Sequence, residues 1–84
     1  MRTIIITGAS GGLAQEMVNL LPDDQLILLG RNKEKLAQLY GNHPNVELIE
    51  IDITDDSALE ALVADLHLRY GKIDVLINNA GYGI

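Results

Sequence analysis

The stretch that decides the fold is TIIITGASGGLA at residues 3–14, a β-branched run followed by a glycine-rich loop. Thr3–Thr7 is predicted as a strand, and its unbroken apolar middle suits a strand covered on both faces. The loop at 8–12 leads into a predicted helix at 13–21, which Pro22 ends. A strand, a glycine loop and a helix in this order indicate the first unit of a parallel α/β sheet.

The same alternation continues along the chain. Further strands are predicted at 26–29, 46–51 and 73–77. A short helix is expected between Asn32 as its N-cap and Gly41 at its end. The longest helix is predicted at 55–70, capped by Thr54 or Asp55, because apolar residues recur there at helical spacing: Leu59, Leu62, Val63, Leu66 and Tyr70.

The resulting order is βαβαβαβ in a single domain over residues 1–84, with no linker. Right-handed crossovers and a reversal after the third strand predict a Rossmann-type parallel sheet with strand order 3-2-1-4 and helices on both faces. A ligand crevice is then expected at the carboxyl ends of the first and fourth strands, where Gly8 and Asn79 lie.

Composition narrows the functions that this chain could have. With 48% hydrophobic and 21% charged residues it is globular and not disordered. Twelve acids against six bases give a net charge of −6, which disfavours nucleic-acid binding. The chain has no cysteine, and its apolar runs are far shorter than the roughly 20 residues of a membrane helix. No signal peptide is recognisable, so we expect a cytoplasmic protein that binds no membrane.

The glycine loop predicts a phosphate site. Gly8 permits a sharp turn off the strand, and Gly12 permits close approach of a pyrophosphate to the backbone. The first N–H groups of the following helix would then point at the anion. The spacing is neither G-x-G-x-x-G nor that of a Walker loop, and a strand-to-helix turn without a ligand is the alternative.

Two motifs resemble the short-chain dehydrogenase/reductase family. The first is Thr-Gly-x-x-x-Gly-x-Gly, here with Gly8, Gly12 and, in place of the third glycine, Ala14. The second is Asn-Asn-Ala-Gly at residues 78–81, and an Asp-Ile-Thr at 52–54 also fits. The resemblance covers the whole chain and implies a nicotinamide dinucleotide site in an oxidoreductase. Because Ala14 adds one methyl group, we expect a small packing adjustment and retained nucleotide binding.

The corner after the second strand predicts which dinucleotide is bound. An NAD site usually has an acid at the end of this strand, whereas here Arg31 follows Gly30. The guanidinium of Arg31 could hold a 2′-phosphate, and two lysines follow nearby. NADP is therefore the predicted cofactor, with NAD less favoured, although Arg31 could also be an ordinary solvated residue at a helix start.

The resemblance also implies contacts for the rest of the dinucleotide. Asp52 and the backbone of Ile53 would contact the adenine, and the Asn79 segment would lie beside the adenosine ribose. The alternatives are a turn carboxylate at Asp52 and sheet-to-loop hydrogen bonding by the asparagines. The residues predicted to bind the cofactor are Gly8, Ser10, Gly11, Gly12, Leu13, Arg31, Asn32, Asp52, Ile53, Asn79, Ala80 and Gly81.

The resemblance implies a catalytic Tyr with a Lys four residues later and a Ser, and this pattern is missing. At that spacing Tyr40 is followed by Pro44 and Tyr70 by Asp74. We therefore predict no catalytic residue, and we expect the chain alone to reduce no carbonyl substrate. No metal site is predicted either, because the histidines lack partners at ligand spacing.

We interpret the chain as the N-terminal coenzyme-binding half of a reductase. A non-catalytic nucleotide-sensing or protein-interaction module with a Rossmann-like fold is the alternative, and an epimerase-like relative is less favoured because its glycine spacing usually differs. The strands at 3–7 and 73–77 are apolar on both sides, yet only one helix is expected on one face of the sheet. We therefore expect a homo-oligomer, or dependence on a C-terminal half, and not a stable monomer.

Overall fold

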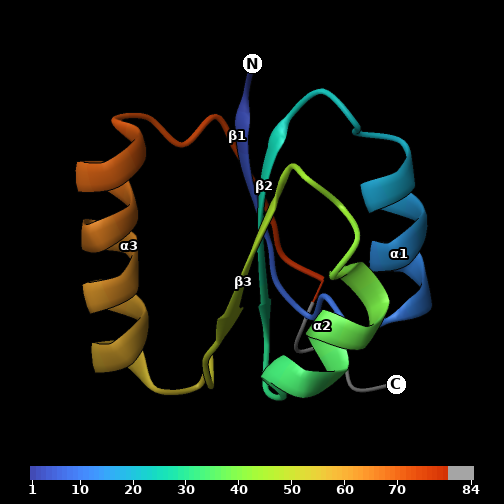
Figure 1. Ribbon diagram of the computed structural model, residues 1–84. Coiled ribbons are helices and arrows are strands. Elements are labelled where there is room, and N and C mark those ends of the chain that lie inside the picture. The colour runs from blue at the N-terminus through green and yellow to red at the C-terminus, as the bar shows by residue number, and fades with distance from the viewer. Residues whose placement is uncertain (80–84) are drawn as a thin grey trace.

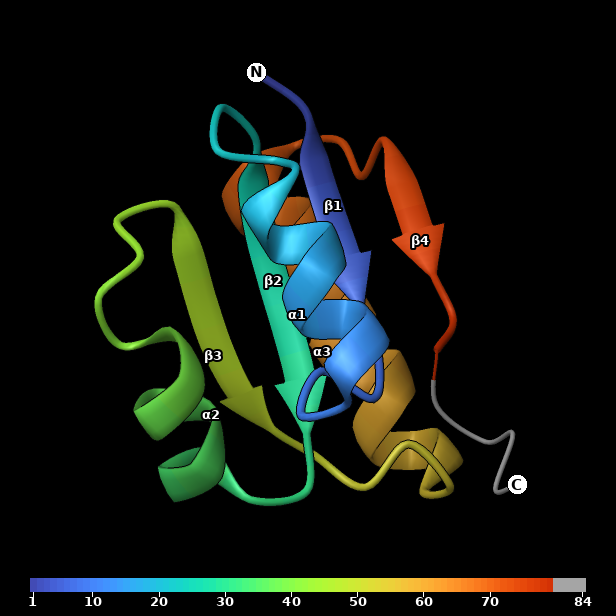
Figure 2. The same cartoon turned by 90° about the vertical axis from the view of Figure 1, so that its right-hand side faces the viewer.

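The strands form one parallel sheet in the order β3-β2-β1-β4, which confirms the predicted topology (Figure 2). The computed structural model of the protein describes residues 1–79. Each strand lies within two residues of its predicted bounds: β1 is Thr3–Ile6, β2 is Gln25–Gly30, β3 is Val46–Glu50 and β4 is Val75–Ile77. The two longest apolar strands, β1 and β2, lie next to each other in the middle of the sheet.

Helices cover the two faces of the sheet unequally, as the crossover argument predicts (Figure 1). Helices α1 (Gly12–Asn19) and α2 (Lys33–Tyr40) lie together on one face, and α3 (Asp56–Tyr70) lies alone on the other. The side chain of Asn32 caps α2 by accepting from the Lys35 N–H at 3.2 Å. Of the two candidates for the cap of α3, Asp55 is the one used, and it accepts from the Ala58 N–H at 3.1 Å.

Two apolar clusters form the core, one on each face, because neighbouring residues of a strand point to opposite sides. Ile4 and Ile6 of β1 face α1 and α2, whereas Ile5 faces α3. The cluster beneath α1 and α2 contains nine buried residues: Ile4, Ile6, Ala9, Ala14, Val18, Leu26, Leu28, Leu36 and Tyr40. The cluster beneath α3 contains only Ile5, Ile27, Leu29 and Leu66.

The face under α3 is therefore incompletely covered. Leu76 of β4 is 62% exposed, and Val63 of α3 is 37% exposed although it belongs to the predicted buried stripe. The sequence suggested that β4 begins at Ile73, but pairing with β1 starts at Val75. Asp74 instead uses its carboxylate to accept from the Thr3 N–H at 2.8 Å, at the amino end of β1.

An ion-pair network ties the end of α3 to β3. The guanidinium of Arg69 binds both carboxylate oxygens of Glu47, at 2.9 and 2.7 Å, and also binds Asp65 at 2.9 Å. The hydroxyl of Tyr70 donates to the same Glu47 carboxylate. The pKa of Glu47 is below its usual value, and the hydrogen bonds that Arg69 donates to its carboxylate are the largest cause.

Candidate functional site

The carboxyl ends of the four strands lie at the same end of the sheet, because the strands are parallel. A cavity of about 260 Å³ opens there. Its lining comes from the ends of β1, β2 and β3, and consists of Gly8, Ser10, Leu29, Gly30, Arg31, Ile51, Ile53 and Thr54. Four residues that the sequence predicted for the cofactor site thus line one cavity: Gly8, Ser10, Arg31 and Ile53.

The glycine loop makes its turn at Gly8. This residue has φ of 61°, a conformation that residues with a side chain rarely adopt, so the requirement for glycine here is conformational. The loop is fixed to β2, because the Ala9 N–H donates to the Leu29 carbonyl at 3.0 Å. Within the loop, the Gly11 N–H donates to the Gly8 carbonyl at 3.2 Å.

Gly12 has a different role from Gly8. It is the first residue of α1, and apart from its chain neighbours and its own helix backbone no atom of residues 1–79 lies within 4 Å of the position that a Cβ would take there. Within the described part of the chain no side chain caps this helix, and its first turn holds no acid, so the N–H groups of residues 12–14 have no acceptor inside the helix. Leu13 is 61% exposed, whereas Ala14 is fully buried against the sheet. A small anion could approach the backbone at this point.

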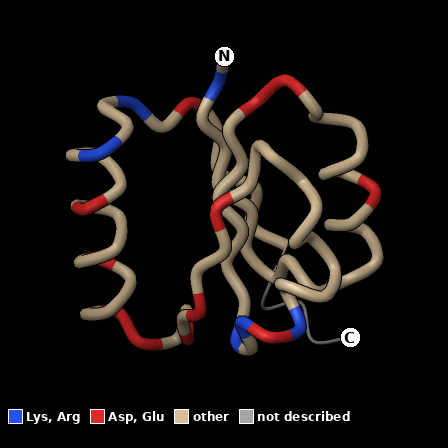
Figure 3. Tube along the Cα trace, viewed as in Figure 1, with Lys and Arg blue, Asp and Glu red and all other residues tan. Residues whose placement is uncertain are grey.

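The corner after β2 is exposed and carries mixed charge (Figure 3). The side chain of Arg31 is 76% exposed, and its Nη2 lies 3.9 Å from Oδ1 of Asp52, a weak surface pair. The carboxylate of Asp52 also accepts from the hydroxyl and the N–H of Thr54, at 2.7 and 3.0 Å. These bonds, the hydroxyl first, lower the pKa of Asp52, so its carboxylate is charged at neutral pH. The side-chain oxygen of Asn32 is engaged in capping α2.

The end of β2 itself carries no acid, as the sequence indicates, but an acid from the neighbouring strand lies beside it. Glu50, the last residue of β3, lies in register with Gly30 of β2. Its carboxylate accepts from the Lys33 N–H at 2.9 Å, at the start of α2. The predicted strand order already places the ends of the second and third strands side by side. It could therefore have indicated that Glu50 lies beside Gly30.

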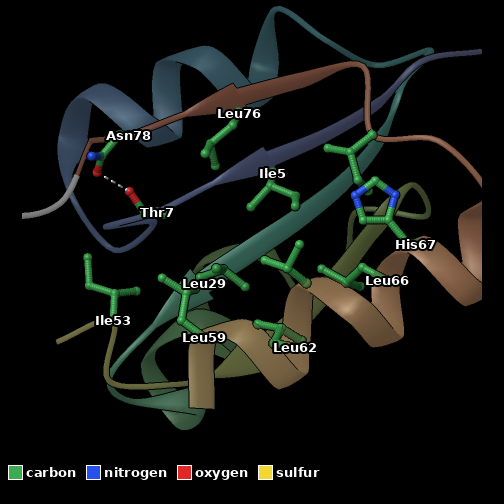
Figure 4. A pocket seen from close by; sticks show the side chains of 12 residues that line it. Ile5, Thr7, Leu29, Ile53, Leu59, Leu62, Leu66, His67, Leu76 and Asn78 are labelled. Atoms are coloured by element: carbon green, nitrogen blue, oxygen red, sulfur yellow. Dashed lines mark hydrogen bonds between the residues drawn. The ribbon is translucent and has the colours of Figure 1, made fainter. Parts of the chain in front are cut away.

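The end of β4 is joined to the glycine loop through Thr7. The hydroxyl of Thr7 donates to Oδ1 of Asn78 at 3.0 Å (Figure 4), and the Asn79 N–H donates to the hydroxyl oxygen at 2.9 Å. The Asn79 amide also donates to the Gly8 carbonyl at 3.3 Å. Both asparagines thus make the sheet-to-loop bonds considered above, and these bonds place Asn79 against the loop. Ala80 and Gly81 lie outside the described residues.

A second cavity, of about 380 Å³, lies between α3 and the β1–β4 part of the sheet (Figure 4). Its walls are mainly apolar, and they are formed by Ile5, Thr7, Leu29, Ile53, Leu59, Leu62, Val63, Leu66, His67, Ile73, Leu76 and Asn78. Beside it, β4 pairs with β1 alone, so within the described residues its other edge has no partner strand. The poorly covered face and the unpaired edge are therefore adjacent.

Residues 1–79 offer two further findings. Nowhere among them do three or more His, Asp or Glu side chains gather in a way that could hold a metal ion. No helix in this part of the chain has the length and apolar character needed to cross a membrane.

Comparison with known proteins defines the class. Residues 2–84 match the family model described as short chain dehydrogenase. An uncharacterized oxidoreductase of Staphylococcus saprophyticus is 37% identical in an alignment that covers 95% of this chain and 34% of that protein. The crystal structure of a short-chain dehydrogenase from Streptomyces avermitilis has a TM-score of 0.85 and 35% identity, over 95% of this chain and 30% of that one.

A metagenomic short-chain oxidoreductase, solved in complex with NADP, has a TM-score of 0.84 and 27% identity, over 98% of this chain and 40% of that one. The chain therefore belongs to the short chain dehydrogenase family. It spans about a third of the length of the curated relatives that it matches.

Proposed function

We propose that this chain is the dinucleotide-binding part of an oxidoreductase and that its dinucleotide is NADP. The observation that carries the proposal is the cavity of about 260 Å³ between the glycine loop and the Arg31 corner. Family membership and the NADP complex of the similar metagenomic oxidoreductase support it.

The glycine loop and the start of α1 would hold the pyrophosphate. Ser10 lines the cavity, and the N–H groups at the beginning of α1 lack a side-chain cap. The positive end of the helix dipole and these N–H groups favour an anion. Gly11, Gly12 and Leu13 are the residues proposed to contact it, and the open space at Gly12 admits a phosphate close to the backbone.

The adenosine would lie across the ends of β2 and β3. Ile53 lines the cavity there, and the ionised Asp52 is available to accept from the adenine amino group. Asn79, with Ala80 and Gly81, is proposed to lie beside the ribose, and the bond from the Asn79 amide to Gly8 supports this placement.

The choice of NADP rests on Arg31, while Asn32, which caps α2, is proposed only to lie beside the cofactor. Arg31 lines the cavity and presents an exposed guanidinium to it, which suits a 2′-phosphate. Glu50 is an acidic side chain near this corner and opposes the preference, and its carboxylate is held at the start of α2 by the Lys33 N–H. A bound 2′-phosphate would compete with Asp52 for Arg31, and their separation of 3.9 Å indicates that this competition costs little.

We further propose that other polypeptide covers the open edge of β4 and the apolar cavity beside it. A second copy of this chain, or a further segment of a longer enzyme, would remove the exposed Leu76 from water. In this proposal the catalytic residues of the oxidoreductase lie outside residues 1–84, and this chain contributes the cofactor site.

Thermal shift measurements with NADPH and NADH test the cofactor proposal. A ligand that binds only the folded state stabilises it by RT ln(1 + [L]/Kd), which is about 2.7 kcal/mol at 100 times Kd. NADPH should raise the melting temperature more than NADH, and Arg31→Asp should reduce the NADPH shift selectively. Lys72→Asp makes the same charge change before β4, at the far end of the sheet, and should leave both shifts unchanged.

Equal shifts with both coenzymes, unaffected by Arg31→Asp, would overturn the NADP preference. No shift with either coenzyme would overturn the dinucleotide proposal itself.

A further inference from the structure

The hydroxyl of Tyr40 makes a buried contact with the glycine loop. Tyr40 is the last residue of α2 and is only 2% exposed. Its hydroxyl donates to the carbonyl of Ala9 at 2.5 Å, across 31 residues of sequence. Ala9 is itself fully buried, so water does not reach this carbonyl, and a donor from the protein has to satisfy it.

Ala9 is thereby held through both of its backbone polar groups. Its N–H donates to Leu29 of β2 at 3.0 Å, and its carbonyl accepts from Tyr40 of α2. The residues on either side, Gly8 and Ser10, line the cavity of about 260 Å³. Fixing the peptide groups around Ala9 therefore sets how this side of the cavity is oriented.

A glycine loop needs such anchors more than most loops do. Three of the five residues at 8–12 are glycines, and glycine has access to more backbone conformations than any other residue. Only a fraction of these conformations would aim the N–H groups at a phosphate. The apparent dissociation constant rises in inverse proportion to the fraction of molecules that are competent to bind.

We propose that Tyr40 is a positioning residue of the dinucleotide site, whose hydroxyl holds the glycine loop in the conformation that receives the pyrophosphate. This inference rests on the proposed function, but its structural part concerns the loop alone. Burial raises the pKa of Tyr40, so the hydroxyl keeps its proton and remains a donor throughout the neutral range.

Tyr40→Phe tests the proposal, because it removes the hydroxyl and keeps the ring in the core. Tyr70→Phe is the matched control, since the hydroxyl of Tyr70 binds Glu47 at β3 and not the loop. Two probes separate the parts of the site: NADPH, which has a pyrophosphate, and adenosine 2′-monophosphate, which has none. Tyr40→Phe should weaken NADPH binding by about three- to ten-fold, the scale of one lost hydrogen bond. It should change binding of adenosine 2′-monophosphate by less than about two-fold.

If the hydroxyl of Tyr40 served only to stabilise the fold, its loss would not weaken the binding of NADPH selectively. Equal weakening of both ligands by Tyr40→Phe, or the same selective loss in Tyr70→Phe, would overturn the assignment.

Hydrogen exchange in the protein without ligand distinguishes this inference from the proposed function. The amides of Ala9 and Gly11 are hydrogen-bonded in the loop, and Tyr40→Phe should accelerate their exchange more than that of the β2 amides. Faster loop exchange without NADPH binding to the wild type would support the role of Tyr40 in the loop and refute the dinucleotide proposal. Unchanged loop exchange would refute the role of Tyr40, whatever the protein binds.

A measurement on the wild type serves if Tyr40→Phe does not fold. The hydroxyl proton of Tyr40 should give a slowly exchanging NMR signal, with a cross-peak to Ala9. The absence of a protected hydroxyl signal would contradict the contact on which the proposal depends.

Discussion

Gly12→Ala should stabilise the fold and weaken cofactor binding, two effects of opposite sign from one methyl group. Gly12 is the first residue of α1. Its φ is not positive, unlike that of Gly8 and Gly71. A Cβ at this position would meet no atom of the described residues within 4 Å outside its own helix backbone and its chain neighbours. Neither the backbone conformation nor the packing of the described residues therefore requires glycine. What remains is the approach of a ligand.

The size of each effect follows from this geometry. Replacing glycine by alanine at a compatible position stabilises a protein by about 0.4–1 kcal/mol, because the unfolded chain loses conformational freedom. For a chain of this size that is a rise of roughly 2–8 °C in melting temperature. An extra methyl group in a fitted contact costs about 1–3 kcal/mol. The affinity for NADPH should therefore fall by about five-fold to a hundred-fold or more.

Two assays on the same samples measure these effects: thermal melting without ligand, and titration of NADPH followed by its fluorescence. Gly71→Ala is the contrasting control. Gly71 has φ of 78° at the end of α3, so alanine is strained there by about 1–2 kcal/mol. It should lower the melting temperature and leave the NADPH affinity unchanged. A lower melting temperature for Gly12→Ala, or an unchanged affinity, would refute the reasoning.

Two further predictions concern stability and assembly. Arg69 lowers the pKa of Glu47 in the folded state, so the pair contributes its full stabilisation when the pH is above the usual glutamate pKa of 4.5. This contribution is lost as the pH falls through the lower pKa of the folded state. The fall in melting temperature between pH 6 and 3 should be smaller in Glu47→Gln, and equal falls would contradict the assignment. Sedimentation at tens of micromolar should show a dimer or larger species that Leu76→Lys dissociates. A wild-type monomer that unfolds cooperatively and binds no apolar dye would refute the assembly proposal.

The topology could be predicted because it depends on patterns that are local in sequence. The alternation of apolar runs with helical spacing predicts the elements, and right-handed crossovers together with a reversal after the third strand predict the order of the strands. Element ends were less accurate. Asp74 lies next to an apolar run, but its carboxylate accepts from the Thr3 N–H, and β4 starts at Val75, two residues later than predicted.

The details of the site depend on contacts that no local pattern records. The ring of Tyr40 lies in the core, but the partner of its hydroxyl is 31 residues away in the sequence, so no local pattern indicates the bond. Glu50 was treated only as part of a strand, although register brings it to the corner beside Gly30. The position of Arg31 after the second strand could be predicted from the sequence. Its pairing with Asp52 could not, because the two residues are 21 positions apart and meet only in the folded chain.

The place of β1 in the sheet has a consequence for biosynthesis. Among the described strands, β1 is the first to leave the ribosome, and its partner on one side, β4, is the last. At about 5–20 residues per second, several seconds separate the two. Throughout that interval the Ile4–Ile6 run has one edge that no native strand can occupy. The nascent chain therefore keeps one edge of this β-branched run without its native partner during that time, and a chaperone that binds short β-branched stretches would act on it there.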